Sequence, residues 1–214
     1  MTDAWTQAAA LKKLRVFRAD RRGIVAIDFA LIGMILAMGM INAVDVGFFI
    51  YQRMEVEYAA EVGAQAAYTT CVPSCTNQNC PSQQLPATQN CSGLNTAVTA
   101  AIQSTSLGTA ITLVTGYPTE GNYCINTSSC LQCVGSISSL PPPPSICSAT
   151  GQKLACSATG QQTDCSAAGN ASTGPGDYIQ VEVTYPYTPL FPGLSVMSAL
   201  GISSITKTSW MRLG

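Results

Sequence analysis

The sequence contains no histidine, and this absence narrows the chemistry that the chain can perform. Without an imidazole, neither a serine–histidine nor a cysteine–histidine nucleophile pair can form. The acidic residues are scattered, and neither a phosphate-binding loop nor a dinucleotide fingerprint is present. We therefore expect a protein that is not an enzyme and that holds neither a metal ion nor a cofactor.

Charge is also scarce, because Asp, Glu, Lys and Arg make up only 10% of the residues and the net charge is −1. Nothing in that balance indicates a nucleic-acid partner. The positive charge is concentrated near the N-terminus, in Lys12, Lys13, Arg15, Arg18, Arg21 and Arg22. These residues precede a long apolar run, which is the arrangement of a membrane segment with a cytoplasmic N-terminus.

The apolar run, residues 24–50, reads IVAIDFALIGMILAMGMINAVDVGFFI. It reaches membrane-spanning length only if Asp28 and Asp45, about 25 Å apart at helical rise, lie near the two interfaces. The run exceeds the h-region of a cleaved secretory signal, so we expect a retained single-pass helix. We expect Asp45 either to pair with Arg53 or to face water at the outer boundary.

Residues 51–68 carry small residues at spacings of three and four, so the helix is predicted to continue beyond the membrane. A helix over 24–68 is about 67 Å long. Inside the span, Gly39, Ala43 and Gly47 form a smooth face on which a second helix backbone can pack closely. The alternative is that Gly and Ala are simply common in membrane helices.

Ten cysteines follow the apolar run, which predicts disulfides in an oxidising compartment. Only Cys130 and Cys133 have the CxxC spacing and no second such pair exists, which disfavours a metal site. The pairing cannot be deduced from the sequence. The disulfide candidates are Cys71, Cys75, Cys80, Cys91, Cys124, Cys130, Cys133, Cys147, Cys156 and Cys165.

The remaining pattern predicts a small α+β head. Helical spacing indicates a second helix over 93–106, and alternation indicates strands at 110–118 and 178–185. A last strand is expected near 203–213. We expect these strands to form an antiparallel sheet. The region 69–214 is the predicted exported domain, and about 119–176 is predicted to be a loop insertion.

An internal repeat lies within that insertion. CSATGQKLA, CSATGQQTD and CSAAGN begin nine residues apart, at Cys147, Cys156 and Cys165, after the proline run 141–144. The copies are too few for a solenoid. They also lack the glycine pairs and aspartates of calcium-binding nonapeptides. A disulfide-stapled surface loop is the better interpretation.

Two stretches resemble a known family. RRGIVAIDFALIGMILAMGMINAVDVGFFIYQRMEVEYAAEVGAQAA resembles the start of TadE-like pseudopilins of tight-adherence (Flp-type) pilus systems, whose pattern is roughly R-x-G-x-x-A-x-E-F-A. YIQVEVTYPYTPLFPGL and the later TSWMR resemble the C-terminal strands of the same family. Asp28 stands where the family usually has glutamate.

The resemblance implies a pilin-like stalk that a prepilin peptidase cleaves after Gly23, which leaves Ile24 as the new N-terminus. It implies a cytoplasmic leader over 1–23, a transmembrane helix over 24–50, and a periplasmic continuation over 51–68. Asp28 would meet the N-terminal ammonium of a neighbouring subunit. The implied partners are other pilin-like subunits, the peptidase and the inner-membrane assembly platform, and the implied locations are the bacterial inner membrane and a surface pilus.

Three functions are therefore open. The first is a minor pilin or pseudopilin that acts in pilus assembly and surface adhesion. The second is a signal-anchored, disulfide-rich binding domain outside the cytoplasm that does not polymerise. The third is a thiol oxidoreductase centred on Cys130 and Cys133.

Overall fold

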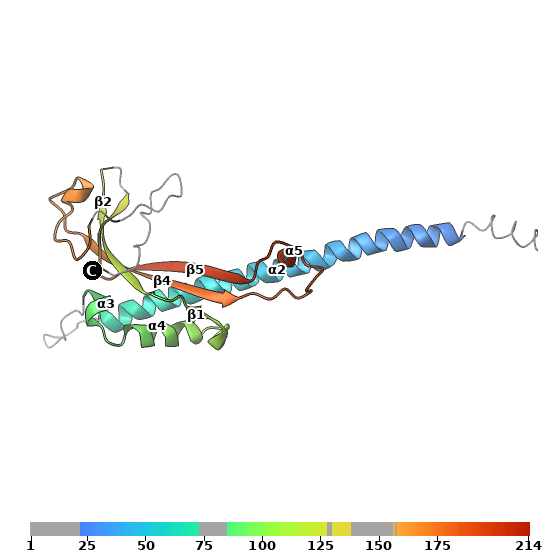
Figure 1. Cartoon of the computed structure of the whole chain (residues 1–214), viewed down its shortest axis with the longest axis horizontal. Helices are drawn as coiled ribbons and strands as arrows, with labels where there is room; N and C mark the ends of the chain where they lie inside the picture. Colours follow the sequence, from blue (N-terminus) through green and yellow to red (C-terminus); the bar gives the residue numbers. More distant parts are fainter. Residues whose placement is uncertain (1–21, 73–84, 128–129, 138–155, 157) are drawn as a thin grey trace, which may run out of the picture. The chain divides into compact units, whose positions relative to one another are not determined.

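A computed structural model describes residues 22–72, 85–127, 130–137, 156 and 158–214 (Figure 1). They divide into two compact units, which are described separately below. One contains residues 22–47 and Pro189–Gly201, and the other contains Phe48–Thr188 and Ile202–Gly214. The leader up to Arg21 and the candidates Cys75, Cys80 and Cys147 lie outside the described residues.

The first element is one continuous helix, α2 (Arg22–Cys71), of 50 residues. No proline interrupts it, and Pro73 follows shortly after its end, where a proline disfavours helical backbone in the preceding residue. The predicted segments 24–50 and 51–68 are therefore parts of a single helix that ends three residues later than expected. By length and composition, α2 qualifies to cross a membrane.

The head contains an antiparallel sheet with β4 at its centre (Figure 1). β5 pairs with β4 along one edge, while β2 and β1 share the other edge, and β3 pairs with β2. The strands are β1 (Thr112–Leu113), β2 (Thr119–Ile125), β3 (Leu131–Ser136), β4 (Gly176–Pro186) and β5 (Ser204–Arg212). The predicted α+β class is confirmed.

The main core lies where two helices, α2 and α4 (Leu94–Gln103), cover one face of the sheet. The short helix α3 (Ala87–Asn90) precedes α4, and α4 buries Leu94, Val98 and Ile102. From β4, the alternating Ile179, Val181 and Val183 are fully buried, as the sequence pattern predicts. Small residues of α2 complete this core: Ala59, Ala60, Gly63, Ala64 and Ala67.

The predicted loop insertion over about 119–176 is wrong in part, because it contains β2 and β3. The sequence of β2, TEGNYCI, has four polar or glycine residues before its first aromatic, so it shows no apolar alternation. The strand is nevertheless buried, because its polar groups have specific partners. Glu120, for example, accepts hydrogen bonds from Thr88 and from the backbone of α3.

The predicted strand over 110–118 is also shorter than expected. Only Thr112 and Leu113 pair with β4 as a strand, and one further hydrogen bond runs from Val114 N to Glu182 O. The chain then turns at Gly116, whose φ is 93° and therefore favours glycine. The predicted helix over 93–106 and the last strand are confirmed as α4 and β5.

Gly63 is the point of closest packing in this core. A Cβ atom at this position would lie 2.8 Å from Ile102 Cγ2 and 3.2 Å from Val181 Cγ1. Both neighbours are β-branched and fully buried, so they have little freedom to move aside.

We expect Gly63→Ala to reduce the free energy of unfolding of the head by about 1–3 kcal/mol, because it overpacks the core. Urea unfolding in detergent micelles, followed by circular dichroism, measures this change. Gly33→Ala is the matched control, since a Cβ there meets no atom within 4 Å. A Gly63→Ala protein as stable as the parent would contradict the packing described here.

Candidate functional site

The predicted processing and assembly residues lie at the start of α2. Gly23 and Ile24 are in its first turn, and Asp28 follows about one turn later with its side chain exposed. No contact in the described part of the chain covers this carboxylate. The structure thus places the predicted cleavage position and the acid within a few residues on one helix.

The predicted packing face is also exposed. Gly39, Ala43 and Gly47 all lie on the surface of α2, and neither glycine has any atom within 4 Å of where a Cβ would be. Large apolar side chains surround this face along the same part of the helix, at Phe29, Leu31, Ile32, Met34, Ile35, Leu36, Met38, Met40 and Val44. This part of α2 therefore has an apolar surface that is free to contact lipid or another helix.

Asp45 does not face water, so the expectation that it faces water at the outer boundary is wrong. Only 1% of Asp45 is exposed. Its Oδ1 accepts a hydrogen bond from Leu190 N at 2.8 Å, and its Oδ2 accepts one from Ser195 Oγ. Since Leu190 and Ser195 are about 150 positions further along the chain, no local pattern indicates this contact.

Asn42, one turn before Asp45, binds the same loop. Its Oδ1 accepts a hydrogen bond from Val196 N at 2.8 Å, and its Nδ2 donates to Met38 O. Val196 begins the short helix α5 (Val196–Ala199), whose N-cap Ser195 also accepts a hydrogen bond from Met197 N. Two polar side chains of the apolar run are thus used to hold Pro189–Gly201. We refer to these contacts as the Asn42–Asp45 clamp.

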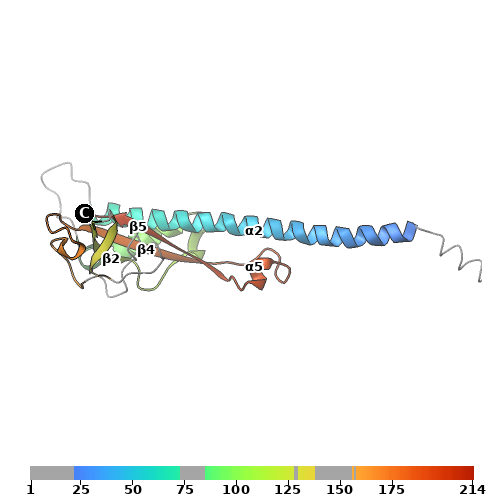
Figure 2. The same ribbon diagram turned by 90° about the horizontal axis from the view of Figure 1, so that it is seen from above.

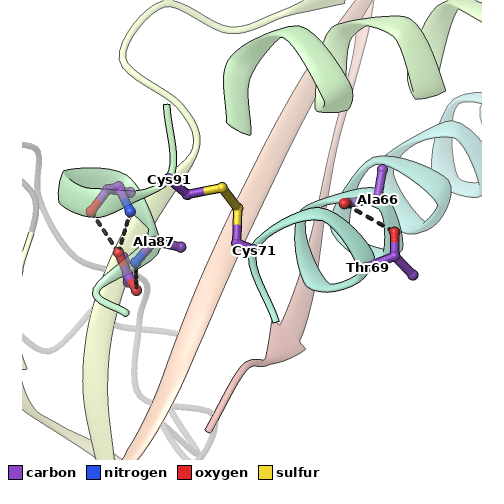
Figure 3. The surroundings of a disulfide bond; sticks show 7 residues. Ala66, Thr69, Cys71, Ala87 and Cys91 are labelled. Carbon is purple, nitrogen blue, oxygen red and sulfur yellow. Dashed lines mark hydrogen bonds between the residues drawn. A yellow bond between two sulfur atoms is a disulfide. The ribbon is translucent and has the colours of Figure 1, made fainter. Parts of the chain in front are cut away.

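Three disulfides of the head join pairs of described cysteines. They are Cys71–Cys91, Cys124–Cys165 and Cys133–Cys156. Cys71–Cys91 joins the last residue of α2 to the residue after α3, and Ala87, which donates to Glu120, lies beside it (Figure 3). Cys130 is also disulfide-bonded, so the described cysteines have the oxidised state that the sequence predicts.

The disulfide pattern argues against the oxidoreductase hypothesis. Cys133 is bonded to Cys156 and is buried, so Cys130 and Cys133 do not form a CxxC disulfide. The nine-residue repeat acquires a structural role instead. Its second and third cysteines, Cys156 and Cys165, fasten this segment to β3 and β2.

Two buried carboxyl groups meet on the sheet of the head. β2 and β4 pair Glu120 with Ile179 and Asn122 with Asp177, so Glu120 and Asp177 are diagonal neighbours on one face. Glu120 is fully buried and accepts hydrogen bonds from Ala87 N and Thr88 N, each at 2.7 Å. In the described part of the chain, neither Asp177 side-chain oxygen has a hydrogen-bond partner with normal geometry, and the nearby backbone amide of Tyr178 offsets the effect of burial only in part.

Burial is the main reason that the pKa of Asp177 is raised, to about 8, and the Glu120 charge adds to the effect. A proton on Asp177 allows a hydrogen bond between the two carboxyl groups, which two carboxylates cannot form. With its pKa raised to about 8, Asp177 keeps a proton at neutral pH. Sequence reasoning missed the pair because the two residues are far apart in the sequence and Glu120 lies in a segment predicted as loop.

Searches against protein-family models, curated proteins and solved structures found no match to this chain.

The raised pKa of Asp177 predicts a pH-dependent stability. The folded state keeps a proton that an unfolded aspartate, with a pKa near 3.9, has released. The free energy of unfolding should therefore fall by a few kcal/mol, as an order of magnitude, while the pH rises from about 4 to about 8.

Urea unfolding between about pH 5 and about pH 9 measures this decline, and Asp177→Asn should remove most of it. Asp164→Asn is the control, because Asp164 is exposed and its pKa is lowered instead. An Asp177→Asn protein that keeps the full decline would show that another group is responsible.

Proposed function

We propose that the chain is a minor pilin or pseudopilin of a tight-adherence pilus, of the TadE-like kind, and that it has a structural role and no catalytic one. It is anchored by α2 in the bacterial inner membrane, with its N-terminus in the cytoplasm and its head in the periplasm. A prepilin peptidase cleaves it after Gly23. Its partners are other pilin-like subunits and the inner-membrane assembly platform, and it acts in pilus assembly and surface adhesion.

The observation that carries this proposal is the contrast between the two parts of α2. The first part is apolar, exposed and long enough to cross a membrane, and the last part buries small residues in the core of the head. A single helix that anchors a domain and also forms its core is what a pilin-like stalk requires. The basic leader before Gly23 and the acid at Asp28 support the same proposal.

Asp28 supplies the specificity of assembly in this proposal. An ionised Asp at the centre of a membrane helix costs about 2.5–3.5 kcal/mol on insertion scales, and less near the interface. The ammonium of Ile24 on a neighbouring mature subunit would neutralise it. Because an unpartnered charge in the membrane is costly, the pair favours one register of the two helices.

The exposed face at Gly39, Ala43 and Gly47 supports helix–helix packing in the same assembly. Small residues four apart let two backbones approach closely in lipid. Ala43 and Gly47 each lie about 160° around the helix axis from Asp45, and a Cβ at Gly39 or Gly47 meets no atom within 4 Å. Pro189–Gly201 therefore does not block this face within the subunit.

Processing is the first test. We expect mass spectrometry of the native protein to show a mature N-terminus at Ile24, and we expect Gly23→Arg to leave the chain uncleaved but still in the alkali-resistant membrane fraction. A native protein that keeps residues 1–23 would instead favour the signal-anchored binding domain that does not polymerise.

Assembly is the second test. Removing one partner of a buried charge pair costs about 3 kcal/mol or more, which corresponds to roughly a hundredfold weaker association. We therefore expect Asp28→Ala to insert normally but to lower the amount of this subunit recovered in sheared pili. Asp28→Glu keeps the negative charge, on the residue type that the family usually has, and serves as the matched control. Equal recovery of the Asp28→Ala protein would argue against the pairing.

A further inference from the structure

The segment Pro189–Gly201, between β4 and β5, has an apolar outer surface. It contains no charged residue. Its large side chains are unusually exposed, with exposed fractions between 38% and 66%, at Leu190, Phe191, Leu194, Val196 and Leu200. A contiguous apolar patch of this kind indicates a contact with a membrane or with another protein.

The backbone of the segment is, by contrast, well supplied with hydrogen bonds. The amides of Leu190 and Val196 donate to Asp45 and Asn42, and that of Met197 donates to Ser195 Oγ. Others bond within the segment, at Leu194, Ser195, Ala199, Leu200 and Gly201. In a medium without water, the polar groups of irregular backbone need hydrogen-bond partners within the protein. This segment has such partners on its inner side, and its apolar side chains point outward.

The clamp fixes the position of Pro189–Gly201 along the axis of α2. Asn42 and Asp45 lie within the apolar run 24–50, and both views show α5 beside α2 (Figures 1 and 2). At the same height along the helix axis, Met40 and Val44 expose 72% and 57% of their surface. The exposed apolar side chains of the segment therefore lie at the same height as exposed apolar side chains of the helix.

We propose that Pro189–Gly201 is a second lipid-contacting element, which enters the exported leaflet of the bilayer beside α2. This inference rests on the proposed membrane span. Asp45 is about 25 Å along the helix from Asp28, which places the clamp near the exported hydrocarbon boundary when Asp28 is near the cytoplasmic one. The clamp then has a second purpose, because it shields an acid and an amide that would otherwise face lipid.

Tryptophan fluorescence of the full chain in vesicles tests the proposal. Leu194→Trp places a reporter on the segment without adding a cysteine to a disulfide-rich protein. The vesicles contain phosphatidylethanolamine, phosphatidylglycerol and phosphatidylcholine with brominated acyl chains, which quench only reporters in the hydrocarbon. Acrylamide quenches reporters in water. The emission of Trp5 and Trp210 is measured on the parent protein and subtracted.

Two matched variants complete the experiment. Met40→Trp reports on the span itself, and Ile125→Trp replaces an apolar residue of the head that is 58% exposed. We expect brominated lipid to quench Leu194→Trp about as strongly as Met40→Trp, and we expect only acrylamide to quench Ile125→Trp. Adding Asp45→Ala to Leu194→Trp should reduce the lipid quenching, because it removes two hydrogen bonds of the clamp.

The outcomes separate the two proposals. If brominated lipid quenches Met40→Trp but Leu194→Trp responds to acrylamide, the segment lies in water and the inference is wrong. If neither reagent reaches Leu194→Trp, another protein chain covers the segment, which also overturns the lipid contact. If Met40→Trp itself escapes lipid quenching, the membrane span is wrong and the inference fails with it.

Discussion

The close packing of α2 against the sheet is the constraint on which the head depends. A helix that enters this core has to approach both α4 and β4, and Gly63 permits the closest contact, with Ile102 and Val181. Alanines on the same face allow similar proximity along the rest of the interface. Larger side chains would add apolar area, but they would also push the helix away from the sheet. The small residues therefore determine where the head is attached to its helix.

The same helix meets a different requirement in its first part. There its surface is apolar and uncovered, except where Asn42 and Asp45 bind the segment between β4 and β5. The two polar side chains are placed in an apolar run, yet the structure provides each with a backbone or hydroxyl donor. Asn42 and Asp45 contact a part of the chain that is distant in sequence. These contacts hold Pro189–Gly201 in a fixed position on the helix.

Sequence reasoning predicted the elements that have a clear period. α4 and β4 show regular apolar spacing, and the long helix shows an apolar run followed by small residues at helical spacing. These elements and β5 are each present close to the predicted range. It missed β2 and β3, because their buried positions are occupied by polar, glycine and cysteine residues whose partners lie elsewhere. The hydrogen bonds of Asp45, the pairing of the cysteines and the meeting of Glu120 with Asp177 all join residues distant in sequence, so no local pattern could show them.

The disulfides of the head are nested, since the loop closed by Cys124–Cys165 contains the loop closed by Cys133–Cys156. A chain threaded across a membrane, as proposed above, presents its cysteines to the oxidising machinery from the N-terminal side first. Cys124 is then accessible together with Cys130 and Cys133 before its native partner has emerged. Rapid oxidation would join the wrong neighbours, and thiol–disulfide exchange would have to correct them. Oxidation of the cysteines in their order of emergence would therefore not give this nested pairing directly.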